Sequence, residues 1–269
     1  PDDSELLYIN NYAFFESSIS VIKIPPHVQQ IGSYAFNSCQ KLKTVEFSEN
    51  SELRLIDSYA FASTPITAIS IPPHVQQIGS YAFNSCQSLQ NLTFAEDSEL
   101  TFIDGYAFFS SSIEKVDIPI HVQHIGAYAF SSCNKLKILT FSKDSELSII
   151  ETYAFSSSPI EKLTIPSYVQ EIGDHAFSSC QRLKSLTFAE DSILRSIHSY
   201  AFASTSIEKA SIPPHVREIG DHAFSSCRKL KNVLFTKNSE LQTINNGAFA
   251  QTSIERLTIP SHVDSLKEG

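Results

Sequence analysis

The stretch VQQIGSYAFNSCQKLKTVEF, from Val28 to Phe47, decides the fold of this 269-residue chain, because variants of it recur from end to end. Its dipeptide Ala-Phe occurs at residues 13–14, 35–36, 60–61, 82–83, 107–108, 129–130, 154–155, 176–177, 201–202, 223–224 and 248–249. The spacing alternates between 22 and 25 residues. The chain is therefore an array of eleven short units, grouped in 47-residue pairs.

Two kinds of unit alternate along the array. The Cys units contain Cys39, Cys86, Cys133, Cys180 or Cys227, and the Pro units end at Pro25, Pro72, Pro119, Pro166, Pro213 or Pro260. Each unit closes with Leu-x-x-Val-x-Phe or Ile-x-x-Ile-x-Ile, which alternates as a half-buried strand does. Proline lacks an N–H, so it ends the strand. The preceding Val-x-x-Ile-Gly-x-x-Ala-Phe predicts a short extended piece, a turn at the Gly and one turn of 3₁₀- or α-helix.

A unit of 22 to 25 residues cannot bury its own apolar face, but stacked units bury each other's. The closing strands then form a parallel sheet with about 4.8 Å between neighbours. The phenylalanines of the Ala-Phe dipeptides are expected to form one internal column. The sequence therefore predicts an elongated solenoid and not a compact globule.

The pattern Ile31-Gly32, Ala35-Phe36, Cys39 and Leu42 resembles the BspA-type (Treponema pallidum-type) leucine-rich repeat, and the resemblance runs from about Leu6 to Val263. It implies an α/β or mainly β solenoid over residues 1–269: a curved, right-handed superhelix of about eleven repeats with a parallel sheet on its concave face. Members are described as surface proteins of bacteria and mucosal protozoa that bind host matrix or cells. The resemblance thus implies a cell-surface or extracellular adhesion protein.

Composition narrows the classes of partner. The formal net charge of −9 argues against general affinity for nucleic acid or an anionic membrane. No apolar run approaches the ~20 residues of a membrane span. The chain begins at Pro1, part-way into a unit, and contains no Met. We therefore expect it to be a piece of a longer product.

Neither a disulfide nor a metal site is expected. The cysteines recur in every second unit, about 9.6 Å apart, whereas a disulfide needs Cα atoms within about 7 Å. They are interpreted as buried free thiols. His121 and His124 are the nearest approach to a ligand pair, and His27, His74, His215 and His262 share the slot of His121. The acidic turns, such as Glu96-Asp97-Ser98-Glu99, lack the spacing of a calcium loop and are interpreted as ordinary turns.

No catalytic motif is present: G-x-S-x-G, G-x-x-x-x-G-K, H-E-x-x-H and G-x-G-x-x-G are all absent. We expect a non-enzymatic protein without a cofactor. Its default ligand surface is the outward face of the closing strands. The candidate residues are Glu46, Asn91, Lys115, Asp117, Ile138, Lys162, Lys209, Asn232, Leu234 and Arg256.

Two further rows are read as structural. Opposite charges alternate from unit to unit at Glu114, Lys137, Glu161, Lys184, Glu208, Lys231 and Glu255, a row of exposed attractions worth about 0–1 kcal/mol each. Tyrosines precede Ala-Phe at Tyr12, Tyr34, Tyr59, Tyr81, Tyr106, Tyr128, Tyr153 and Tyr200, with His175 and His222 in the same slot. Half-buried packing with the hydroxyl in water is favoured there over a binding surface.

Two functions remain open at this point. The first is a recognition module that binds a protein or glycan ligand, such as host extracellular matrix. The second is a scaffold that self-associates through its uncapped ends, where core and strand edges would be exposed. A matrix pull-down would test the first function, and light scattering against concentration would test the second.

Overall fold

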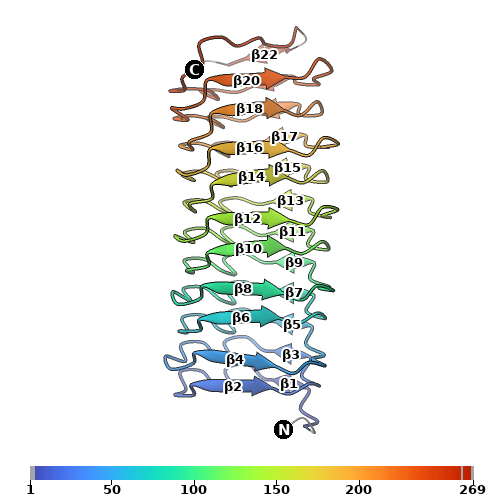
Figure 1. The fold of residues 1–269 in the computed structure, drawn as a ribbon, viewed down its shortest axis with the longest axis vertical. Helices are drawn as coiled ribbons and strands as arrows, with labels where there is room; N and C mark the ends of the chain where they lie inside the picture. The colour runs from blue at the N-terminus through green and yellow to red at the C-terminus, as the bar shows by residue number, and fades with distance from the viewer. Residues whose placement is uncertain (1–3, 262, 268–269) are drawn as a thin grey trace.

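The computed structural model describes residues 4–261 and 263–267 as a parallel β-solenoid of about ten coils, in which one coil is one circuit of the chain (Figure 1). The chain rises as a right-handed spiral, with one row of strands in front and a second row behind. The described residues contain strands and turns but no helix. The solenoid is therefore mainly β, and the expected turn of 3₁₀- or α-helix was wrong.

Ten coils carry one two-residue and one four-residue strand each, and the last two two-residue strands have no four-residue strand after them in the described residues. The four-residue strands are Val21–Ile24 (β2), Thr44–Phe47 (β4), Ala68–Ile71 (β6), Asn91–Phe94 (β8), Lys115–Ile118 (β10), Ile138–Phe141 (β12), Lys162–Ile165 (β14), Ser185–Phe188 (β16), Lys209–Ile212 (β18) and Asn232–Phe235 (β20). The two-residue strands are Tyr8–Ile9 (β1), Gln30–Ile31 (β3), Leu55–Ile56 (β5), Gln77–Ile78 (β7), Phe102–Ile103 (β9), His124–Ile125 (β11), Ile149–Ile150 (β13), Glu171–Ile172 (β15), Ser196–Ile197 (β17), Glu218–Ile219 (β19), Thr243–Ile244 (β21) and Ser265–Leu266 (β22).

Strands pair in parallel with the same strand of the next coil. The two-residue strands form one sheet of twelve, from β1 to β22. Six of the four-residue strands, β6 to β16, form a second sheet, and β2–β4 and β18–β20 pair on either side of it. Equivalent residues face each other in register, as Lys162 faces Ser185 and Ile165 faces Phe188. The strands thus place equivalent side chains in columns.

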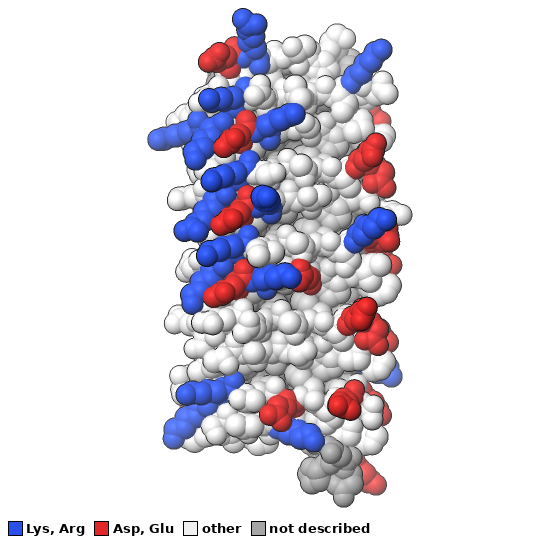
Figure 2. Space-filling model, viewed as in Figure 1, with Lys and Arg blue, Asp and Glu red and all other residues white. Residues whose placement is uncertain are grey.

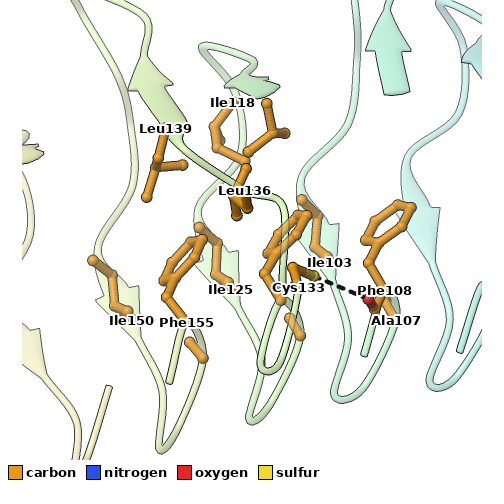
Figure 3. Packing of buried hydrophobic residues seen from close by; sticks show 14 of the residues in the cluster. Ile103, Ala107, Phe108, Ile118, Ile125, Cys133, Leu136, Leu139, Ile150 and Phe155 are labelled. Carbon is orange, nitrogen blue, oxygen red and sulfur yellow. Dashed lines mark hydrogen bonds between the residues drawn. The ribbon is translucent and has the colours of Figure 1, made fainter. Parts of the chain in front are cut away.

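Phenylalanines form the central column of the core (Figure 3). Phe36 to Phe224, taken one per coil, are fully buried. Neighbouring rings stack with centroids 5.0–5.5 Å apart, within the preferred range for aromatic pairs. Buried isoleucines of the two-residue strands, such as Ile103, Ile125 and Ile150, lie beside this column. The predicted phenylalanine column is confirmed.

The turn before each four-residue strand is built from left-handed residues. Tyr128 and Ser132 have φ of 59° and 57°, and their equivalents in other coils lie between 54° and 60°. A bulky residue pays about 1–2 kcal/mol for this conformation. It lets alternate N–H groups donate to the next coil: Tyr128 N to Thr152 O at 3.0 Å, and Phe130 N to Ala154 O at 2.7 Å. Inter-coil hydrogen bonds therefore replace the expected helical turn.

The Gly that recurs in every Cys unit has a different role from the turn that the sequence suggested. Its φ is not positive in these units, so the turn does not depend on it. A Cβ on Gly126 would lie 2.6 Å from Gly105 N, and one on Gly79 would lie 2.8 Å from Ser58 N. Glycine is required because the backbone of the preceding coil passes too close for any side chain.

The cysteines are buried free thiols, as expected. Each Sγ lies within hydrogen-bonding distance of the carbonyl of the preceding unit's Phe, as Cys133 does with Phe108 O at 3.3 Å (Figure 3). Burial raises the pKa of Cys133 to about 11, against a smaller opposing effect of its hydrogen bond with Ser111. These thiols are core residues that satisfy a backbone carbonyl.

Candidate ligand-binding face

The outer surface of the four-residue strands, here called the sheet face, carries the candidate residues. In each strand the second residue points into the core, and the first and third point outward. Nine of the ten candidates are exposed on these strands: Glu46, Asn91, Lys115, Asp117, Ile138, Lys162, Lys209, Asn232 and Leu234. Arg256 is also exposed, but it lies outside any strand. The strand expected around Arg256 was therefore wrong, whereas the outward positions of the other nine were placed correctly.

Two adjoining hollows lie on the sheet face. One, of about 730 Å³, is lined by Thr140, Thr164 and Lys162 and by the acidic turn that contains Asp144. The other, of about 620 Å³, is lined by Thr187, Ser211, Lys184 and Lys209 and by Glu190. Both therefore have a hydroxyl-rich floor between basic side chains at one edge and carboxylates at the other.

Charges are unevenly distributed over this face, with basic side chains more numerous at one edge and acidic ones at the other (Figure 2). Basic side chains gather over the beginnings of the strands, at the left of the view, and acidic side chains follow the ends of the strands at the right. Lys115 and Asp117 form an ion pair of 2.7 Å on one strand. Burial raises the pKa of Asp117, but hydrogen bonds from Lys115 and Thr140 outweigh it and hold that pKa below its usual value.

The alternating charge row lies along the basic edge. Lys137 N donates to Glu114 O at 3.0 Å, and Lys184 N donates to Glu161 O at 3.1 Å, so successive members belong to adjacent coils as expected. Among the ion pairs of the described residues, none joins two members of this row. The lysines of the row, Lys137, Lys184 and Lys231, are exposed.

The tyrosine row is a continuous stack on another side of the coil. Rings from Tyr12 to His222 stack at 4.4–4.9 Å, with His175 and His222 taking tyrosine slots. All but Tyr12 are half-buried. Each ring covers the face of the next, so only ring edges and hydroxyls meet solvent. Burial raises the pKa of Tyr59, Tyr106 and Tyr153. Half-buried packing, the favoured interpretation, is confirmed.

Histidine–carboxylate pairs join neighbouring coils, a feature that the sequence analysis missed. His121 Nδ1 lies 3.1 Å from Glu146, and His124 Nε2 lies 2.9 Å from Glu151. The slot of His121 repeats this contact at His27–Glu52, His74–Glu99 and His215–Glu240, at 2.8–2.9 Å. The constant 25-residue separation was the available signal. His262, assigned to the same slot, lies outside the described residues.

The two histidines of the candidate metal pair thus contact different carboxylates. In the part of the chain that the structure describes, no three His, Cys, Asp or Glu side chains converge on one point. The same residues include no helix long and apolar enough to cross a membrane.

The coils define the class of protein: a leucine-rich-repeat solenoid. The sequence matches, in six copies over residues 7–137 and 148–269, the family described as "BspA type Leucine rich repeat region". The chain belongs to that family. A comparison with curated proteins found no match.

Solved structures share the fold. A leucine-rich repeat protein from Eubacterium ventriosum is 18% identical, with a TM-score of 0.59, over 98% of this chain and 79% of its own. The pneumococcal vaccine antigen PcpA is 21% identical, with a TM-score of 0.53, over 96% of this chain and 78% of its own. At these identities the likeness concerns the fold alone.

Proposed function

We propose that this chain is a non-enzymatic recognition module, exposed outside the cell, that binds a protein or glycan ligand such as host extracellular matrix through the sheet face. The observation that carries the proposal is the face itself. In-register pairing holds its outward side chains in fixed columns, and two adjoining hollows lie among them. The strands of this surface are already ordered, so a ligand that contacts several coils binds with a smaller loss of conformational entropy.

Membership of the BspA-type family supports a role in interaction, because solenoids of this kind present extended binding surfaces. One protein of similar fold is described as a vaccine antigen, which supports exposure outside the cell. The apolar side chains Ile138 and Leu234, each half exposed, supply contact area on an otherwise small and polar face. The contact is expected to be distributed over several coils.

The test compares two faces with substitutions that the array already accommodates. The sheet-face variant is Ile138→Asn with Leu234→Thr, because Asn232 and Thr187 occupy the equivalent positions in other Cys units. The control on the opposite sheet is Phe102→Thr with Ile149→Ser, which copies Thr243 and Ser196. Neither variant changes the charge.

Purified chains are applied to arrays of matrix proteins and glycans and to host cells. The proposal expects retention by at least one component, weaker binding of the sheet-face variant and unchanged binding of the control. It is contradicted if nothing is retained, or if both variants lose binding equally.

A further inference from the structure

A cluster of exposed basic side chains lies at the beginnings of two adjacent four-residue strands. Lys162 begins β14, and Arg182 and Lys184 precede β16, all three exposed. Lys162 faces Ser185 in register, and Lys184 N donates to Glu161 O at 3.1 Å. The three side chains therefore emerge from neighbouring coils at one edge of the sheet face. We call this group a basic cluster.

The cluster is repeated by the 47-residue period. Equivalent exposed residues are Lys115, Lys135 and Lys137 in one direction, and Lys209, Lys229 and Lys231 in the other. Corresponding members are two coils apart, about 10 Å, and the three clusters extend about 25 Å along the solenoid. Figure 2 shows the resulting basic stripe over strands β10 to β20. The strands pair in register within β10–β12, β14–β16 and β18–β20, and this keeps each cluster the same in arrangement.

The stripe has a local excess of positive charge in an acidic protein. Its nine basic side chains are accompanied by four carboxylates, those of Glu114, Asp117, Glu161 and Glu208, in a chain of net charge −9. Within the described residues, Lys115 alone of the nine forms an ion pair with a carboxylate. The remaining charges are exposed and directed at solvent, so an anionic ligand can meet them without first breaking an ion pair.

The narrow shape of the stripe favours a ligand that is a single extended anionic chain. Each four-residue strand is about 13 Å long, and beyond its end lie acidic turns such as Asp144 and Glu190–Asp191. A broad polyanion would overlap these carboxylates. A narrow chain that follows the solenoid axis would remain over the basic edge and contact successive clusters.

The chemistry beside the stripe favours a polysaccharide. Exposed aromatic platforms, on which single-stranded nucleic acid stacks, do not occur at the outward positions of the described strands β10, β12, β14, β16, β18 and β20. The aromatic anchors typical of protein interfaces are missing from these positions as well, and the exposed Tyr168 lines the neighbouring hollow and not the basic edge. A column of hydroxyls lies next to the stripe, with Thr164 and Thr187 hydrogen-bonded at 2.8 Å. Hydroxyls of this kind can exchange hydrogen bonds with sugar hydroxyls.

We infer that the basic stripe binds a linear polysaccharide bearing regularly spaced sulfate or carboxylate groups. The inference rests on the proposed function, because the polysaccharide occupies the edge of the same sheet face. Eight of the nine side chains are lysine, and the ninth is Arg182. Lysine acts as a point charge without a fixed fork, which suits anionic groups on a flexible chain.

The array itself supplies a variant that should fold. The second 47-residue pair has Ala68, Ser88 and Gln90 at the cluster positions. The loss variant is therefore Lys162→Ala, Arg182→Ser and Lys184→Gln. The control, Arg54→Gln, Arg195→Gln and Lys237→Gln, removes the same number of charges from exposed positions away from the stripe and from both hollows. The gain variant, Ala68→Lys, Ser88→Lys and Gln90→Lys, extends the stripe.

Calorimetric titration with heparin at several salt concentrations measures the binding. We expect log K to fall with log salt, because binding releases counterions from the polyanion. The loss variant should bind about tenfold more weakly and with a smaller salt slope, since three exposed charge contacts with the polyanion are lost. The control should keep most of the affinity for heparin, and the gain variant should bind heparin more tightly than the unmodified chain does.

The inference is overturned if heparin does not bind at low salt, if the loss and control variants are equally impaired, or if an oligothymidylate of equal charge binds as tightly and with the same sensitivity to the loss variant. These outcomes are separable from failure of the proposed function. If matrix or cell binding depends on Ile138 and Leu234 but heparin does not bind, the proposed function is retained. The inference that the stripe binds an anionic polysaccharide is then refuted.

Discussion

Truncation of a central ring of the phenylalanine column, Phe130→Ala, should strongly destabilise the solenoid. Phe130 is fully buried and stacks between Phe108 at 5.0 Å and Phe155 at 5.3 Å. Removal of a buried phenyl ring loses its transfer free energy and leaves a cavity that stacked coils cannot readily close. The expected loss in free energy of unfolding is about 3–5 kcal/mol.

A matched variant at the end of the column separates stacking from ordinary burial. Phe14 is only partly buried, and in the described residues it stacks on Phe36 alone, at 5.0 Å. Phe14→Ala should therefore cost less than half as much, because a half-exposed ring leaves no closed cavity. Urea unfolding followed by far-ultraviolet circular dichroism measures both, since the chain has no Trp to report by fluorescence. Equal costs for Phe14→Ala and Phe130→Ala, or a cost below about 1 kcal/mol at Phe130, would refute the shared core.

Three further predictions follow from the coil geometry. Gly126→Ala should lower the thermal midpoint clearly, whereas Gly105→Ala, whose Cβ would meet Ala127 O at 3.2 Å and Ala127 N at 3.9 Å, should lower it less, and equal losses would contradict this. Cys86, whose pKa burial raises to about 11, should react with an aromatic disulfide reagent only after unfolding, and rapid labelling of the native chain would contradict this. The hydrogen bond with His74 lowers the pKa of Glu99, so its contribution to stability is present above about pH 4.5 and lost as the pH falls further. His74→Gln should flatten that part of the midpoint-against-pH profile, and an unchanged profile would refute the contribution.

The repeat period was sufficient to predict the architecture. Ala-Phe and the cysteines recur at fixed spacing, so one physical solution had to serve every unit, and stacking is the solution that buries the apolar positions of all of them. The same regularity placed Lys162 and Thr164 on the outside of a strand and Leu163 inside it. Prediction succeeded where the answer depended on periodicity.

Prediction from the sequence failed where a feature depended on contacts between coils. The sequence suggests that Gly126 is a turn glycine, yet this position excludes any side chain because the backbone of Gly105 lies against it. The left-handed turn at Tyr128 is stabilised by a hydrogen bond to Thr152 of the next coil, which no local propensity encodes. His121 and Glu146 were both visible, but their contact follows only once the offset between coils is known. The basic stripe likewise emerges only when residues 20 to 22 apart are brought side by side.

In-register stacking of neighbouring coils aligns the core, the sheet face and the basic stripe, and a designed cross-link tests it most directly. Thr164 and Thr187 face each other in β14 and β16, with their hydroxyls 2.8 Å apart. Thr164→Cys with Thr187→Cys should form a disulfide under mild oxidation, because paired strands lie about 4.8 Å apart, within disulfide range. Thr140→Cys with Thr187→Cys, two coils apart at about 9.6 Å, should remain reduced. Equal cross-linking of the two pairs, or none in the first, would contradict the account.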